Sequence, residues 1–193
     1  IAYEKQIDAV ALPFKSELHV LKMEAGKSNF EEIFIKGNET HYYYNPQFVK
    51  SQRGIELFLN GFEVSKRTSF FEKLTLKEGV FSDPVKLQIQ DDLNDQLRPW
   101  VFARVNSDNT TTLSYEFKHF NEHPPTELER NHLKFAKSFD GIHFDQSIEM
   151  GTGVMPRHAE FSTGKKIFTR QNGNLKNMMV YFRLSLDGIR WSE

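Results

Sequence analysis

Polar and aromatic side chains gather beside three prolines, which recur at intervals of roughly 50 residues. The three segments read Asn45-Pro46-Gln47, Arg98-Pro99-Trp100 and Met155-Pro156-Arg157-His158. Amide, guanidinium, indole and imidazole groups can orient a small ligand when a fold brings them to one pocket. We therefore predict that Arg98, Trp100, Arg157 and His158 bind a substrate. An ordinary surface or strand role is the alternative for each of them.

Each proline is expected to begin the first strand of a repeated β unit, because its missing N–H costs no ladder bond there. A polar turn leads to a second strand, expected at 54–59, 112–117 and 166–170. A third strand is expected at 133–137 and 178–184, and a further hairpin at 19–23 and 31–35. These short strands, with a high aromatic content and regular turns, predict an all-β chain.

Two nearly identical turns follow the expected third strands. They read Ser138-Phe139-Asp140-Gly141-Ile142-His143-Phe144 and Ser185-Leu186-Asp187-Gly188-Ile189-Arg190-Trp191, with a degraded copy at 77–81. An Asp-Gly pair supplies the positive φ of a tight turn, and its carboxylate can accept bonds from the same turn. We predict a structural role for both aspartates and a core position for Phe144 and Trp191.

The S-x-D-G-I-x-[FW] turns resemble those of five-bladed glycosidases of the arabinanase and fructosidase type and, with one residue fewer before the glycine, those of Asp-box sialidases. The resemblance covers roughly residues 44–191. It implies a β-propeller with antiparallel four-stranded blades and a ligand pocket on the axis, at one end of the inner strands. The chain would form a single domain over 1–193 with about three to four blades.

The propeller enzymes of these families close five or six blades, so we expect the chain to be an incomplete propeller or part of one. Another segment of the same protein is then a potential partner, because the uncovered β-edges invite association.

The resemblance also implies roles for particular residues. In the five-bladed glycosidases an Asp often precedes the blade proline, whereas Asn45, Arg98 and Met155 stand there in this chain. Asp95 lies close enough to Arg98 to take that role. Sialidases grip a carboxylate with arginines, and Arg157 and Arg170 are the expected counterparts, since a guanidinium makes two parallel bonds to a carboxylate.

Cleavage of a glycosidic bond needs two carboxyl groups in distinct environments. Glu116, in an expected middle strand, is the first candidate, and its partner is Asp95 or Glu160. The chain is therefore interpreted as a glycoside hydrolase that cleaves a terminal glycosidic bond. The alternative is a non-catalytic propeller that binds glycan or protein, which the missing Asp-Pro pairs favour.

Composition excludes several other classes of function. The 25 Lys and Arg against 26 Asp and Glu leave a net charge of −1, which argues against nucleic acid and anionic membranes as partners. No run of about 18 apolar residues occurs. Cysteine is absent, and no nucleotide, dinucleotide, serine-hydrolase or zincin motif is present.

The irregular spacing of His119, His123 and His132 favours a solvated loop over a metal site. We predict no metal and no cofactor, and the sequence does not indicate a compartment.

Overall fold

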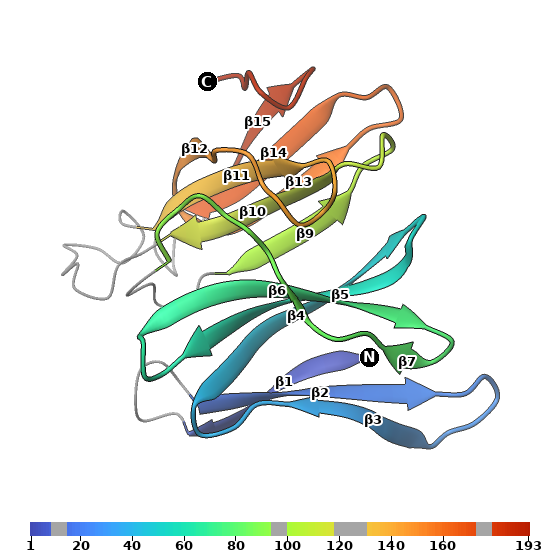
Figure 1. Cartoon of the computed structure of the whole chain (residues 1–193). Coiled ribbons are helices and arrows are strands. Elements are labelled where there is room, and N and C mark those ends of the chain that lie inside the picture. Colours follow the sequence, from blue (N-terminus) through green and yellow to red (C-terminus); the bar gives the residue numbers. More distant parts are fainter. Residues whose placement is uncertain (9–14, 94–99, 118–130, 173–178) are drawn as a thin grey trace.

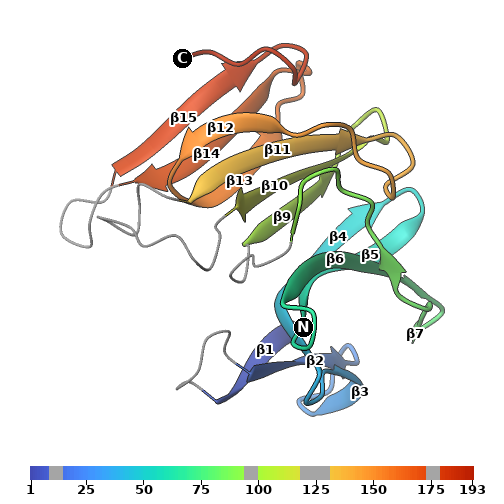
Figure 2. The ribbon, with the colours of Figure 1, turned by 60° about the vertical axis from the view of Figure 1, so that its left-hand side comes forward.

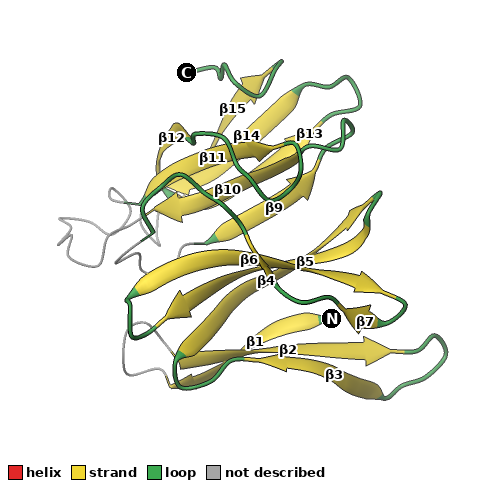
Figure 3. Cartoon of the chain, in the orientation of Figure 1, coloured by secondary structure: helices red, strands yellow, loops and turns green. Residues whose placement is uncertain are grey.

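The computed structural model describes residues 1–8, 15–93, 100–117, 131–172 and 179–193. Every regular element in these ranges is a β-strand (Figure 3). The predicted all-β class is confirmed. Within the same ranges, no helix has the length and apolar character needed to cross a membrane.

The strands form four antiparallel sheets that follow one another along the chain. The first sheet contains β1 (Ala2–Asp8), β2 (Lys15–Met23) and β3 (Phe30–Lys36). The second contains β4 (His41–Ser51), β5 (Gly54–Glu63), β6 (Thr68–Lys77) and β7 (Val80–Phe81), and β8 (Val85–Lys86) also pairs with β6.

The third sheet contains β9 (Val101–Val105), β10 (Thr111–Phe117), β11 (His132–Ser138) and β12 (Ile148–Thr152). The fourth contains β13 (Val154–Glu160), β14 (Lys166–Asn172) and β15 (Met179–Ser185). In each sheet the strands lie in chain order. The third sheet has the four-stranded form expected for a blade. The first and fourth sheets have three strands among the described residues.

The four sheets pack face to face in sequence order, with the first and fourth at opposite ends of the stack (Figures 1 and 2). The first strands of neighbouring sheets lie side by side, since β4 contacts both β1 and β9, and β9 contacts β13. Three apolar cores fill the spaces between the sheets. Because side chains alternate along a strand, one strand serves two cores. Leu57 and Leu59 of β5 face the first sheet, whereas Phe58 joins the core shared with the third.

Two of the repeated prolines lie inside strands, which corrects the prediction that they begin them. Pro46 falls within β4 and Pro156 within β13, and the pairing with the next strand shifts register at both places. The preceding residues, Asn45 and Met155, have positive φ values of 50° and 52°. Each Pro therefore sits in a β-bulge, where the lost N–H breaks no regular ladder bond. Pro99 lies outside the described residues.

The two Asp-Gly turns have the predicted geometry. Gly141 and Gly188 have φ values of 74° and 77°. The Asp140 carboxylate accepts the backbone N–H groups of Ile142 and His143, each at 2.8 Å. Asp187 does the same for the two residues that follow Gly188, at 2.8 and 2.9 Å. These carboxylates are therefore occupied in holding their turns.

Candidate functional site

The first strands of all four sheets line one groove of about 340 Å³, which we call the inner-strand groove. Its lining residues are Ala2, Tyr3 and Glu4 from β1; Asn45, Pro46 and Gln47 from β4; Trp100, Val101 and Phe102 at β9; and Arg157 from β13. The groove exists because the sheets pack with these strands side by side. It brings together residues that lie about 50 positions apart in the sequence.

Arg157 is the best-defined charged group of the groove. Its guanidinium carbon lies 5.4 Å from the centre of the Trp100 ring and 4.8 Å from that of Phe102. Nη1 also donates a 3.0 Å hydrogen bond to the carbonyl of Pro156. Burial lowers the pKa of Arg157, and the negative charge of Glu116 opposes that shift. The side chain remains a cation whose orientation is fixed by two aromatic rings.

Two amide side chains from β4 have different roles in the groove. Gln47 bonds both backbone groups of Ala103, donating to its carbonyl and accepting its N–H, each at 2.8 Å. It therefore ties the second sheet to the third. The buried Nδ2 of Asn45 has no hydrogen-bond partner among the described residues. An amide N–H₂ in this state favours an acceptor atom on a ligand.

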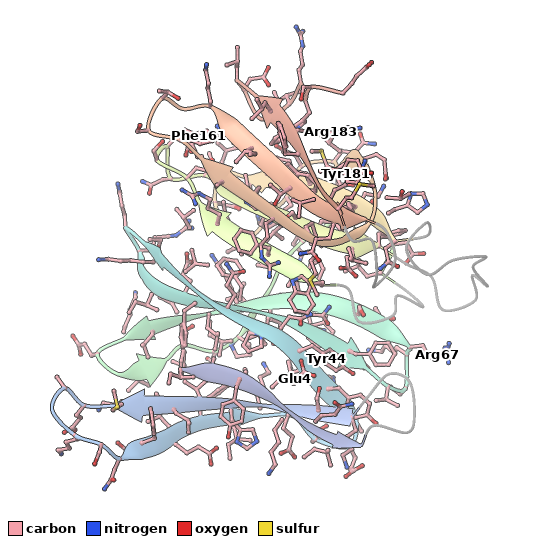
Figure 4. The ribbon with its side chains drawn as sticks, turned by 180° about the vertical axis from the view of Figure 1, so that it is seen from behind. Glu4, Tyr44, Arg67, Phe161, Tyr181 and Arg183 are labelled. Carbon is pink, nitrogen blue, oxygen red and sulfur yellow. The ribbon has the colours of Figure 1, made fainter. Side chains whose placement is uncertain are left out.

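The groove residues on β1 were not expected from the sequence. Tyr3 stacks on His19 of β2, with ring centroids 5.2 Å apart. Glu4 is partly buried and brings a carboxylate to the groove. Figure 4 shows Glu4 on β1 and Tyr44 on β4, two strands in contact with each other. Residues 1–8 carry no proline and no turn that relate them to the repeat, so no feature of the sequence marked them as part of the groove.

Glu116 lies immediately behind the groove rather than on its lining. Its backbone N–H donates to the carbonyl of Trp100 at 3.0 Å. The carboxylate accepts the backbone N–H of Met155 at 2.8 Å and the Nδ2–H of Asn131 at 3.2 Å. Of the two predicted catalytic carboxylates that the structure describes, Glu116 rather than Glu160 lies next to Trp100 and Arg157.

Glu160 lies at the opposite end of β13. Its carboxylate accepts hydrogen bonds from the backbone N–H and the hydroxyl of Ser107, at 3.0 and 3.2 Å, and lies 3.5 Å from Lys166. Burial alone would raise the pKa of Glu160, but the bonds from Ser107 and the charge of Lys166 lower it. Met155 and Glu160 are about 15 Å apart along the strand, too far for Glu116 and Glu160 to flank one glycosidic bond.

His158 is buried between the third and fourth sheets and does not line the groove. Nε2 is 2.7 Å from the hydroxyl of Thr112, and Nδ1 is 3.0 Å from that of Ser114. Burial lowers the pKa of His158 to about 3, helped by the nearby charges of Arg104 and Arg157. Both nitrogens of the neutral ring are thus used in packing the two sheets together.

Arg170 is also separated from the groove. Arg157 pairs with Thr169 across the β13–β14 ladder, so the adjacent Arg170 points to the other face of the sheet. Its guanidinium donates to the carbonyl of Thr152 and lies 5.3 Å from the centre of the Tyr181 ring. The two arginines that were expected to share one anion therefore serve different faces.

The remaining predicted site residues, Asp95 and Arg98, lie outside the described residues. The described ranges contain no group of three His, Cys, Asp or Glu side chains arranged to hold a metal ion.

No protein-family model matches the chain, and no curated protein is similar to it in sequence. Among solved structures, the chain is similar to an N-acetylgalactosamine deacetylase from F. plautii, determined in complex with blood group B trisaccharide. The TM-score is 0.50 and the identity 12%, over 80% of this chain and 52% of that one. The chain thus spans about half the length of that neighbour. At this identity the similarity concerns the fold alone.

Proposed function

We propose that the chain is a β-propeller, or part of one, whose inner-strand groove binds a carbohydrate. One observation carries this proposal: the first strands of four successive sheets line a single groove that contains Trp100, Arg157 and an unpartnered Asn45 amide. In propellers the first strand of each blade faces the axis, where ligands bind. The single domain over 1–193 is part of the same proposal.

The chemistry of the groove suits a sugar. Aromatic groups provide an apolar contact surface, while the Asn45 amide and the Arg157 guanidinium offer hydrogen-bond donors in fixed positions. A fold shared with an enzyme that acts on N-acetylgalactosamine supports this class of ligand. The cation at Arg157 further favours a sugar with a carboxylate, because a guanidinium can bind its two oxygens in parallel.

Binding to a small panel of sugars tests this proposal. The panel contains galactose, N-acetylgalactosamine, blood group B trisaccharide and a methyl glycoside of N-acetylneuraminic acid, measured by calorimetry. Trp100→Ala should weaken binding of every sugar that binds the parent. Arg157→Ala should weaken the acidic sugar by about 1.5 to 3 kcal/mol, the range for a hydrogen bond to a charged group.

Arg170→Ala is the matched control, since it removes the same group from the other face of the same sheet. It should leave every affinity unchanged. If no sugar binds the parent, or if Trp100→Ala binds them all equally well, carbohydrate binding in this groove is rejected.

Hydrolysis of a glycosidic bond is the second candidate, and it is favoured by the carboxylate of Glu4 in the groove lining. Asp95 remains the sequence-based candidate for a second carboxyl group, because the carboxylate of Glu116 is bonded to Met155 and Asn131. A screen of chromogenic glycosides on the parent decides between catalysis and binding alone. If turnover is found, Glu4→Gln should abolish it and spare binding, because the amide keeps the shape and removes the charge.

A further inference from the structure

Glu116 does not line the groove, but it makes two hydrogen bonds to the backbone of segments that do. Its backbone N–H holds the carbonyl of Trp100, which precedes β9. Its carboxylate holds the backbone N–H of Met155 in β13. One residue of β10 is thus bonded to both of the segments that carry the Trp100 ring and the Arg157 guanidinium.

The second contact falls on the least regular point of β13. Met155 adopts a φ of 52°, which is uncommon for a residue other than glycine, and the pairing of β13 with β14 is interrupted between Val154 and Arg157. Surrounding contacts must hold such a conformation in place. The bond to Glu116 and the bulge proline, Pro156, both act at this point. The bulge in turn decides where the side chain of Arg157, two residues later, is directed.

We infer that Glu116 is the positioning residue of the inner-strand groove, which sets the stack of Arg157 on Trp100 by fixing the Met155 bulge. This role concerns geometry rather than proton transfer, because the carboxylate is bonded to Met155 and Asn131. The positioning role stands on the described contacts. It depends on the proposed function only for its effect on a bound sugar.

Two substitutions separate length from charge at this position. Glu116→Asp keeps the charge but shortens the side chain by one methylene, so that its carboxylate no longer reaches the N–H of Met155. Glu116→Gln keeps the length and loses the charge. Its carbonyl oxygen can accept the Met155 N–H. Its amide then faces the Nδ2 of Asn131, and it can donate to Asn131 once that side chain flips to exchange Nδ2 for Oδ1, an atom with no partner among the described residues.

The first measurement is hydrogen exchange of the Met155 backbone amide in the ligand-free protein, followed by NMR. We expect at least tenfold faster exchange in Glu116→Asp and a rate within threefold of the parent in Glu116→Gln. The indole N–H signal of Trp100 should shift in the Asp variant and stay in place in the Gln variant. Trp191, packed between the third and fourth sheets, is the internal reference.

Glu149→Asp is the matched control, because Glu149 is a strand carboxylate that contacts His132 and Lys134 outside the groove. It should change neither readout. The inference is overturned if Glu116→Asp leaves both the exchange rate of the Met155 amide and the Trp100 indole signal as they are in the parent. It is also overturned if Glu116→Gln changes them as much as Glu116→Asp does. These readouts need no ligand, so they hold even if no sugar binds. For a sugar that binds the parent, Glu116→Asp should weaken the affinity about tenfold and Glu116→Gln less than threefold.

Discussion

At the scale of single residues, His158 follows the groove residue Arg157 in the sequence, yet its side chain is buried in the interior. Its ring is enclosed by Phe102 and Phe135, with centroids at 5.2 and 5.3 Å, and its pKa is lowered to about 3. An unfolded chain would bind a proton on this histidine near pH 6.5. Between these two pH values the unfolded state therefore holds more protons than the folded state.

It follows that His158 should make stability depend on pH. The free energy of unfolding should be unaffected by this group above about pH 6.5, and should fall by up to roughly 1.4 kcal/mol per pH unit as pH drops toward 3. Urea unfolding between pH 8 and 5 measures this slope. His158→Asn should reduce the slope, whereas His132→Asn, at a half-exposed histidine, should retain it. An equal slope in the parent and His158→Asn would contradict the assignment.

Trp191 gives a second prediction at this scale. Its ring packs on Phe135 and Phe168, with centroids at 5.2 and 6.1 Å, and remains partly exposed. Trp191→Ala should cost roughly 3 kcal/mol of unfolding free energy, the low end for a large aromatic. Leu186→Ala, at a residue 76% exposed in the same turn, should stay within about 0.5 kcal/mol. Similar losses in both variants would show that Trp191 does not act as a core residue.

Sequence reasoning at the residue scale placed Trp100 and Arg157 in the groove but also placed His158 and Arg170 there. The difference lies in side-chain direction. A register shift of one residue exchanges the two faces of a strand, and the shift at Pro156 falls within the predicted site. Chain order alone does not reveal which of Arg157 and His158 faces the groove. The bulge determines it.

At the scale of elements, the two Asp-Gly turns share one conformation but have different surroundings. Hydrogen bonds from Arg190 and Ile189 lower the pKa of Asp187 to about 2. Hydrogen bonds from His143 and Ile142 hold the pKa of Asp140 far below its ordinary value. The turn at Asp140 also docks on the second sheet, since Arg53 donates to its carbonyl at 3.0 Å.

This difference predicts unequal effects of one substitution. A Cβ at Gly141 would lie 2.9 Å from Nη2 of Arg53, 3.0 Å from Nζ of Lys73 and 3.1 Å from Oγ1 of Thr111, and both cations are held by the buried carboxylate of Glu56. At Gly188 the Cβ would meet the side chain of Lys166, at 3.0 Å and beyond. Both changes strain a positive φ, which costs about 1 kcal/mol. Gly188→Ala should cost about that much in urea unfolding, and Gly141→Ala at least about 1 kcal/mol more. Equal costs would show that the turn at Asp140 is not tightly docked.

The sequence predicted the second strand of each copy of the repeat, the third strand of the last two copies and the β2–β3 hairpin, because alternation and turn residues are local signals. It did not predict β6, the third strand of the first copy. It did not predict β1 or β12. The residues of β1 include no Gly or Pro, and β12 contains Gly151 and is five residues long. Both strands are defined by pairing with a neighbour, β2 and β11 respectively, rather than by a pattern of their own.

At the scale of the whole molecule, the stack has two ends, and β15, the edge strand of the sheet at one end, is rich in exposed apolar residues. Five of the seven residues of β15 are large and exposed, from Tyr181 at 40% to Val180 at 65%. Arg183 is the one charged residue of this strand. The edge strand β3 at the other end carries Glu31, Glu32 and Lys36. Charges of this kind protect an exposed edge from pairing with another chain, and β15 has fewer of them than β3.

The geometry of β15 predicts self-association. Leu184 bonds Ser192 on its outer side, at 2.8 and 3.0 Å, so the alternating residues Phe182 and Val180 also direct their backbone groups outward. An antiparallel pair centred on Tyr181 would place Val180 opposite Phe182 of a second copy, a favourable cross-strand pair. We expect sedimentation velocity to show a dimer that dissociates on dilution. Phe182→Lys should give a monomer, and Leu186→Lys, which adds the same charge in the turn, should not. A monomeric parent at high micromolar concentration would exclude this pairing.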